Sequence, residues 1–178
     1  MKAIQIKQPT SLDSWALVDM PDAPAPGPGE IKVRIRASSL NYHDFAVVVG
    51  MLPTADGRIP MSDGAGEIVA IGDGVTDYAV GDMVVSTFFP DWLDGTPPST
   101  AFTRVPGDGI DGYAREFVTA PTSWFTHVPK GYSAAEVAEH FGVSRAYVYV
   151  VKSNEKKKGK KPKQKTVKFL KKMKWSRP

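Results

Sequence analysis

A series of short apolar segments, separated by turns rich in glycine and proline, constrains the fold of this chain more than any other feature. In the clearest segment, Glu30–Arg36, Ile and Val alternate with Lys and Arg. This period of two places one face of a strand on a core and the other face in water. Residues 21–29, with the sequence PDAPAPGPG, are incompatible with a helix or a central strand.

The same pattern recurs along residues 1–132 and predicts a mainly β domain. A short helix is expected to end at Val49, and Asp91–Asp111, rich in Gly, Pro, Asp and Thr, is expected to be a long loop. Short strands with frequent turns favour an antiparallel barrel or sandwich over a βαβ sheet. Further strands are predicted at Lys2–Lys7, Trp15–Met20, Gly66–Ile71, Met83–Phe89, Glu116–Thr119 and Trp124–Val128.

The residue types present exclude several kinds of chemistry. The 178 residues contain no Cys, which rules out disulfides, thiolate nucleophiles and cysteine-ligated zinc. Only His43, His127 and His140 are left to join carboxylates at a metal, so no metal site is expected. The sequence shows no run of about 18 apolar residues and no basic-then-apolar leader. It therefore predicts a cytoplasmic protein that does not enter a membrane.

The formal net charge of +4 hides a division of charge along the chain. Residues 152–178 contain thirteen Lys and Arg and one acid, whereas residues 1–151 contain ten basic and eighteen acidic side chains. A low-complexity basic segment of this kind has little apolar surface to bury. Residues 152–178 are therefore predicted to be a disordered basic tail.

Residues 133–151 differ in character from the residues before them. Ser133 and Glu136 fit a capping box, in which hydroxyl and carboxylate satisfy the free amides of a first helical turn. Gly142 would end this helix, and a second helix is predicted over Arg145–Val151. The segment is therefore expected to form a helical hairpin.

The glycine-rich stretch at residues 107–112, GDGIDG, matches G-x-G-x-x-G literally. That motif binds a pyrophosphate only when a strand precedes it and a helix follows, because the helix N-terminus meets the phosphates. Here the tripeptide 104–106, RVP, precedes the motif and a short strand is expected after it. The stretch is therefore interpreted as a flexible loop and not as a nucleotide site.

A denser group of polar side chains lies at residues 38–44, SSLNYHD, where the alternating strand passes into the short helix. Together a hydroxyl, an amide, a phenol, an imidazole and a carboxylate could orient a carbonyl or relay a proton. The same residues could equally form a capping turn with ordinary surface side chains. The spacing alone leaves both interpretations open.

Three motifs follow the proline-rich loop within residues 1–132: EIKVRIRASSLNYHDFAVVVG, then IPMSDGAGEIVAIGDGVTDYAVGDMVV, then GYAREFV. In this order they resemble the N-terminal half of the medium-chain dehydrogenase/reductase superfamily, and within it the zinc-independent, quinone oxidoreductase-like alcohol dehydrogenases. The resemblance implies a GroES-like, partly open β-barrel with short helices. In that family the partner half is a Rossmann domain that holds NADP.

The resemblance also implies a set of site residues. In zinc-dependent members a Cys ligand takes the place of Asn41, and the pair at Ser62-Asp63 is His-Glu; this sequence has neither, which implies the zinc-independent branch. The implied reaction is hydride transfer between NADPH and a small carbonyl or quinone. Asn41 and Tyr42 would line the nicotinamide pocket. His43 and Asp44 would be the candidate catalytic groups of a proton relay.

The likeness stops near Ala138, and no strand–Gly-turn–helix unit follows it. A dinucleotide fold needs several βαβ units of roughly 30 residues each. The chain is therefore predicted to be a truncated or chimeric oxidoreductase without its cofactor domain, which alone neither binds NADP nor is active. Exposure of the barrel face that a Rossmann domain covers also predicts self-association.

The segment EVAEHFGVSRAYVY resembles the helix-turn-helix of insertion-sequence transposases and small repressors. It suggests an alternative function in which the second helix faces a major groove and the Lys-rich tail contacts phosphates, without strong sequence preference. The competing interpretation is a helical hairpin at the end of a truncated enzyme, with a tail translated from unrelated sequence. The candidate nucleic-acid contacts are Arg145, Lys156, Lys157, Lys158, Lys160 and Lys161.

Overall fold

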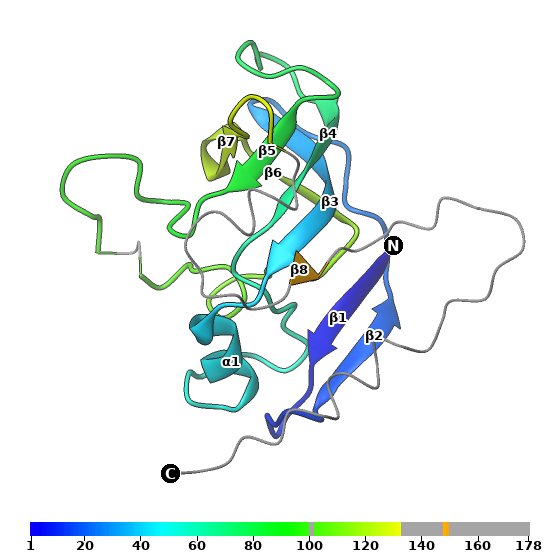
Figure 1. Ribbon diagram of the computed structural model, residues 1–178, viewed down its shortest axis with the longest axis vertical. Coiled ribbons are helices and arrows are strands. Elements are labelled where there is room, and N and C mark those ends of the chain that lie inside the picture. Colours follow the sequence, from blue (N-terminus) through cyan, green and yellow to red (C-terminus); the bar gives the residue numbers. More distant parts are fainter. Residues whose placement is uncertain (100–101, 133–147, 150–178) are drawn as a thin grey trace, which may run out of the picture.

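The computed structural model describes residues 1–99, 102–132 and 148–149. Within them the chain is mainly β, with one short α-helix and one 3-10 turn (Figure 1). The elements are β1 (Lys2–Ile6), β2 (Trp15–Asp19), β3 (Glu30–Ser39), α1 (Tyr42–Val48), β4 (Ala65–Ile71), β5 (Met83–Ser86), β6 (Phe117–Pro121), η1 (Thr122–Trp124), β7 (Phe125–His127) and β8 (Val148–Tyr149).

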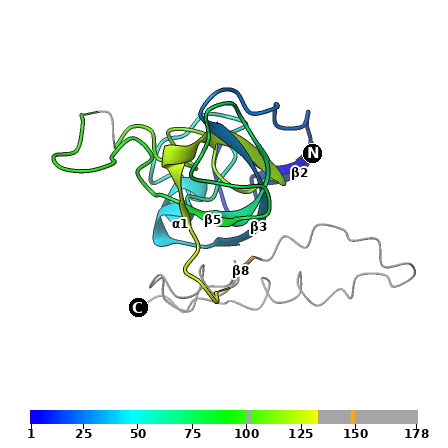
Figure 2. The same ribbon diagram turned by 90° about the horizontal axis from the view of Figure 1, so that it is seen from above.

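The long strand β3 organises the larger sheet. The sheet has the order β6-β3-β4-β5-β7, with antiparallel neighbours, and β8 pairs with β3 off this path. Viewed from above, its strands curve around a common interior (Figure 2). Among the described residues the outer strands β6 and β7 do not pair, so the sheet is not closed.

The core fills the interior of this curved sheet. Side chains of β3 alternate between buried and half-exposed positions, and Ile31, Val33 and Ile35 are at most 1% exposed. They pack with side chains from β4, β5, β6, β7 and the segment before β6, namely Ile68, Val84, Tyr113, Val118, Ala120 and Phe125. The period of two in the sequence is therefore confirmed as one face on a core.

A separate hairpin of β1 and β2 flanks the larger sheet, and α1 lies beyond the end of β3 (Figure 1). The hairpin is joined to the sheet through backbone hydrogen bonds, such as that from the Ile4 N–H to the Ala114 carbonyl at 2.8 Å. Between β5 and β6 a long loop projects from the sheet (Figure 2). These elements confirm the predicted strands, the short helix ending near Val49 and the loop, with shifts of a few residues at their ends.

Only two residues of the predicted C-terminal hairpin, Val148 and Tyr149, are among the described residues. Val148 and Tyr149, predicted to lie within a helix over Arg145–Val151, form the strand β8 and pair with Ser39 and Ser38 of β3. Val and aromatic residues favour extended backbone. The rest of the predicted hairpin and the tail, residues 133–147 and 150–178, lies outside the described residues.

Close packing of β3 on β4 depends on a residue without a side chain. A Cβ atom at Gly66 would lie 2.2 Å from the Arg34 carbonyl oxygen and 2.8 Å from a methyl group of Val33. Gly66→Ala is therefore expected to destabilise the fold by about 1–3 kcal/mol, as other insertions into packed sites do. Urea unfolding followed by circular dichroism measures the loss.

Glu67→Ala, one residue along the same strand, is the matched control. Glu67 forms a partly exposed ion pair with Arg36 at 2.6 Å, and such pairs contribute about 0–1 kcal/mol. If Gly66→Ala unfolds at the same urea concentration as Glu67→Ala, the proposed close contact between β3 and β4 does not exist.

Candidate active site

The residues between β3 and α1 form a tight polar turn, in which Asp44 is the buried centre. Its side chain is 2% exposed, and its two carboxylate oxygens accept hydrogen bonds from the backbone N–H groups of Asn41 and Ser62, both at 2.8 Å. The bond to Asn41 closes the first turn of α1, and the bond to Ser62 ties that turn to the segment before β4. Asp44 thus serves the capping role that the sequence left open as an alternative.

A cluster of hydrogen-bonded polar residues, Ser39, Asn41, Ser62 and Asp63, lies beside this turn. The Asn41 Nδ2 donates to an oxygen of Asp63 and to the Ser62 Oγ, the latter at 3.2 Å. The Ser39 Oγ donates to the same carboxylate at 3.0 Å. We call these four residues the Asp63 cluster; its carboxylate is held by side-chain donors from both ends of the β3–α1 turn.

Burial makes Asp63 an unusual carboxylate. Removal from water raises the pKa of Asp63 above its usual value, and the hydrogen bonds from Asn41 and Ser39 only partly oppose this rise.

The backbone just before Ser62 and Asp63 is strained, because Met61 has a φ of +79°. Such a conformation persists in a non-glycine residue only where the surroundings impose it, and it is frequent near functional sites.

His43 lies next to the Asp63 cluster, between two carboxylates. Its Nδ1 is 4.0 Å from an Asp44 oxygen, and its Nε2 is 3.3 Å from an Asp108 oxygen. Asp44 and Asp108 raise the pKa of His43 above its usual value, and burial of the ring works against them. Nδ1 is buried and has no hydrogen-bond partner within the described residues.

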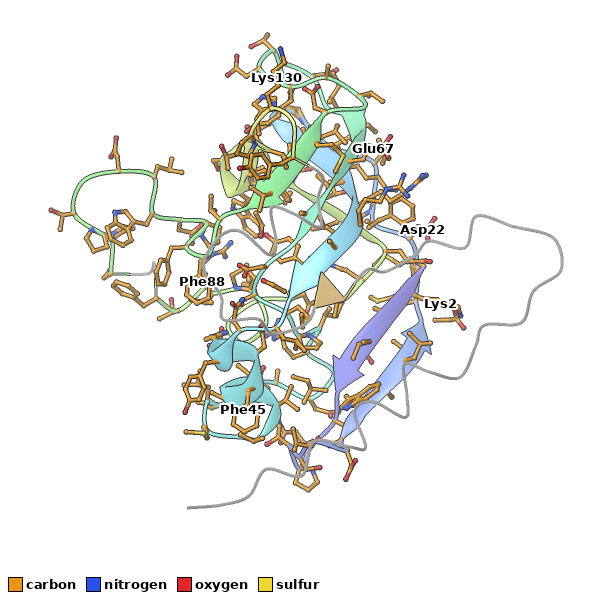
Figure 3. The ribbon with its side chains drawn as sticks, in the orientation of Figure 1. Lys2, Asp22, Phe45, Glu67, Phe88 and Lys130 are labelled. Atoms are coloured by element: carbon orange, nitrogen blue, oxygen red, sulfur yellow. The ribbon has the colours of Figure 1, made fainter. Side chains whose placement is uncertain are left out.

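An aromatic wall extends from His43 along the projecting loop. The ring of Phe88 meets the His43 ring edge-on, with centroids 5.2 Å apart, and it also contacts Phe89 at 4.7 Å. Phe89 in turn contacts Trp92 and Phe102. Figure 3 shows Phe88 at the base of the loop, on its side toward α1. His43 is therefore the point where the polar turn meets a set of contacting aromatic side chains.

The structure brings all four sequence-predicted residues of the enzyme site to the first turn of α1 or to its cap. Asn41 is half-buried in the Asp63 cluster, whereas Tyr42 is 72% exposed and its ring lies 6.1 Å from that of Phe45. His43 and Asp44 are neighbours, but the Asp44 carboxylate is occupied by backbone donors. The predicted nucleic-acid contacts, Arg145, Lys156, Lys157, Lys158, Lys160 and Lys161, lie outside the described residues.

Three residues of the site were not selected from the sequence. Asp63 was compared with zinc-dependent relatives but was given no role, although its place beside Ser62 in IPMSDGAG was a usable signal. Asp108 lies in the GDGIDG stretch, which was dismissed as a flexible loop. Phe88 falls within the predicted strand Met83–Phe89, whereas β5 ends at Ser86 and Phe88 contacts His43.

Comparison with known proteins agrees with this architecture. Residues 27–130 match the alcohol dehydrogenase GroES-like domain, a span that includes β3, α1, the Asp63 cluster and His43. The chain therefore belongs to the alcohol dehydrogenase GroES-like domain family. This confirms the GroES-like part of the resemblance, while the transposase-like segment stays a prediction.

The relatives include proteins named as alcohol dehydrogenases, a quinone oxidoreductase and, at 34–37% identity over short parts of much longer chains, mycobacterial polyketide and phthioceranic acid synthases. The chain is 39% identical over 122 residues to a zinc-type alcohol dehydrogenase-like protein of Schizosaccharomyces pombe, covering 67% of this chain and 35% of the relative. A Sinorhizobium meliloti structure named as an alcohol dehydrogenase is 37% identical, with a TM-score of 0.67, over 78% of this chain and 42% of that one. A Pseudomonas syringae quinone oxidoreductase is 26% identical, with a TM-score of 0.57, over 77% and 36%. The chain thus spans about a third of the length of its yeast relative.

The Asp63 cluster does not fit a zinc ion. Zinc in proteins is bound by thiolate, imidazole and carboxylate groups, but this cluster offers an amide, two hydroxyls and one carboxylate. The Asn41 Nδ2 points its hydrogens at Asp63 and Ser62, so the amide acts as a donor toward these groups. In residues 1–99, 102–132 and 148–149 no three His, Cys, Asp or Glu side chains are arranged to hold a metal.

No helix within the described residues is a candidate membrane span. Over the portion that the structure describes, no helix combines the length and the hydropathy that a bilayer requires.

The raised pKa of Asp63 predicts how stability depends on pH. An acid whose pKa is higher in the folded than in the unfolded state destabilises the fold when ionised, and this penalty is lost as the pH falls through the folded pKa. Asp63→Asn keeps an acceptor oxygen for Asn41 and Ser39 without the charge. It should therefore unfold at higher urea concentration than the wild type near neutral pH, and this gain should shrink as the pH is lowered.

Asp73→Asn, which changes an exposed carboxylate in a turn, controls for the change of net charge. Urea titrations of the three proteins between neutral and acidic pH provide the measurement. A gain from Asp63→Asn that grows on acidification would show that Asp63 is not a destabilised buried carboxylate.

Proposed function

We propose that this chain is the substrate-side half of a zinc-independent, NADP-dependent oxidoreductase that reduces small carbonyl or quinone substrates. The observation that supports this most is the juxtaposition of His43, the Asp63 cluster and the aromatic wall at the turn into α1. An imidazole next to hydrogen-bond donors and an apolar surface is suited to a carbonyl group with an apolar skeleton. The named relatives include alcohol dehydrogenases and a quinone oxidoreductase.

The chain's own residues take distinct parts in this proposal. A bound nicotinamide would supply the hydride, and Asn41 and the exposed Tyr42 would line its pocket. His43 would give a proton to the substrate oxygen. Asp44 would favour the protonated ring through its charge, 4.0 Å from Nδ1, while its oxygens keep their backbone donors.

The zinc-independent assignment is supported by the side chains of the Asp63 cluster, which are hydrogen-bonded to one another. The Asn41 amide hydrogens engage the oxygens that could otherwise face a cation, so the substrate oxygen would be polarised by hydrogen bonds and by the imidazolium. The proposed organisation is a GroES-like domain over residues 1–132, followed by residues 133–151 and the basic segment 152–178. The dinucleotide-binding half would have to come from outside these 178 residues.

A chimera tests the proposed function. Fusing residues 1–132 to the C-terminal part of the Schizosaccharomyces pombe relative should produce a protein that oxidises NADPH in the presence of small quinones or aldehydes. Because a positioned general acid contributes roughly 10²–10⁴-fold, His43→Gln in the chimera should lower kcat about 100-fold or more. Absorbance at the NADPH band measures the rate.

The unfused chain is the control, and NADPH should not quench its tryptophan fluorescence in a saturable way at high salt, where contacts between phosphates and the Lys-rich segment are screened. A folded chimera without activity on either substrate class would contradict the proposed function. Saturable, salt-resistant quenching in the unfused chain would contradict the need for a separate cofactor half.

A further inference from the structure

The GDGIDG stretch forms a tight, internally bonded turn instead of the loose loop expected from the sequence. The Gly107 N–H donates to the Ile110 carbonyl at 2.8 Å, and the Gly109 N–H donates to the Val105 carbonyl at 3.0 Å. Gly107 has a φ of +98°, which favours glycine, and a Cβ at Gly109 would lie 2.1 Å from the Thr103 carbonyl oxygen. The glycines therefore serve to bring this backbone close to its neighbours.

This turn fixes the position of Asp108 at both its backbone and its side chain. The Thr54 Oγ1 donates to the Asp108 carbonyl at 3.1 Å, and one carboxylate oxygen accepts the Gly109 N–H at 2.6 Å. The other carboxylate oxygen lies 3.3 Å from the His43 Nε2. Phe88 meets the ring of His43 edge-on. The imidazole thus contacts both a fixed carboxylate and an aromatic ring.

We propose that Asp108 is the positioning residue of His43: its carboxylate holds the hydrogen on Nε2 and fixes the ring so that Nδ1 faces the Asp44 carboxylate. The proposal rests on the function proposed for His43. Carboxylates that orient imidazoles in this way determine which nitrogen carries the proton. Nδ1 is buried, lies 4.0 Å from the Asp44 carboxylate and has no hydrogen-bond partner within the described residues.

Three carboxylates act on His43 and influence its protonation. Asp44 faces Nδ1 from α1 itself, Asp108 faces Nε2 from the glycine-rich turn, and Asp63 acts on the ring by its charge from the segment before β4. The Asp44 oxygens are fixed by backbone N–H groups. Removal of the Asp108 charge should therefore change the tautomer and protonation of His43 while Asp44 stays in place.

Nitrogen-15 NMR of the histidine rings in the full chain provides the test. His43, one of three histidines, is assigned by the loss of its signals in His43→Gln. The wild type should show the Nε2–H tautomer for His43 above its pKa. Asp108→Asn should lower the pKa of His43 and mix the two tautomers, whereas Asp108→Glu should restore most of the wild-type behaviour.

Asp94→Asn, which removes a carboxylate from the exposed part of the projecting loop, is the matched control and should leave the tautomer of His43 unchanged. If Asp108→Asn behaves like Asp94→Asn, or if wild-type His43 carries its hydrogen on Nδ1, the positioning role is wrong. The second criterion needs no variant and remains available if Asp108→Asn fails to fold. Because the titration requires no cofactor half, an inactive chimera would contradict the function of His43 without contradicting its placement by Asp108.

Discussion

The buried carboxylate of Asp44 is the interaction on which the geometry of this site depends. It accepts backbone N–H groups from Asn41 and Ser62, residues that belong to segments far apart in the chain. Hydrogen bonds of a backbone amide to a charged acceptor contribute about 1.5–3 kcal/mol each. By joining the start of α1 to the segment before β4, they bring Asn41 and Asp63 within hydrogen-bonding distance and place His43 on the outer side of the junction.

In the Asp63 cluster, side-chain hydrogen-bond donors surround a single carboxylate. An amide and two hydroxyls surround one carboxylate, and burial raises the pKa of that carboxylate. The cost of burying Asp63 is only partly offset by its hydrogen bonds, which also orient Asn41. With His43 and Phe88 beside it, this arrangement supports the proposed hydrogen bonding and proton transfer to a substrate oxygen.

The sequence predicted those features that depend on local pattern. Alternation in β3, the proline-rich loop before it and the glycine turns after β4 were sufficient for the main strands, and the polar turn at 38–44 was located as a candidate site. The contact between Asp108 and His43 could not be predicted, because it joins residues 65 positions apart across a turn whose glycines suggested flexibility. The pairing of β8 with the end of β3 was not predicted either, since it is a tertiary effect that residue spacing does not report.

Titration with Co²⁺ tests the central claim, that hydrogen bonds within the Asp63 cluster occupy the place that a metal has in zinc-dependent relatives. Tetrahedral Co²⁺ bound to protein ligands shows strong visible absorption, and a double variant, Asn41→Cys with Ser62→His, serves as the comparison with suitable ligands. The account predicts that the wild-type chain shows no such band on addition of one equivalent of Co²⁺. A stoichiometric tetrahedral band in the wild type, lost in Asp63→Asn, would contradict it.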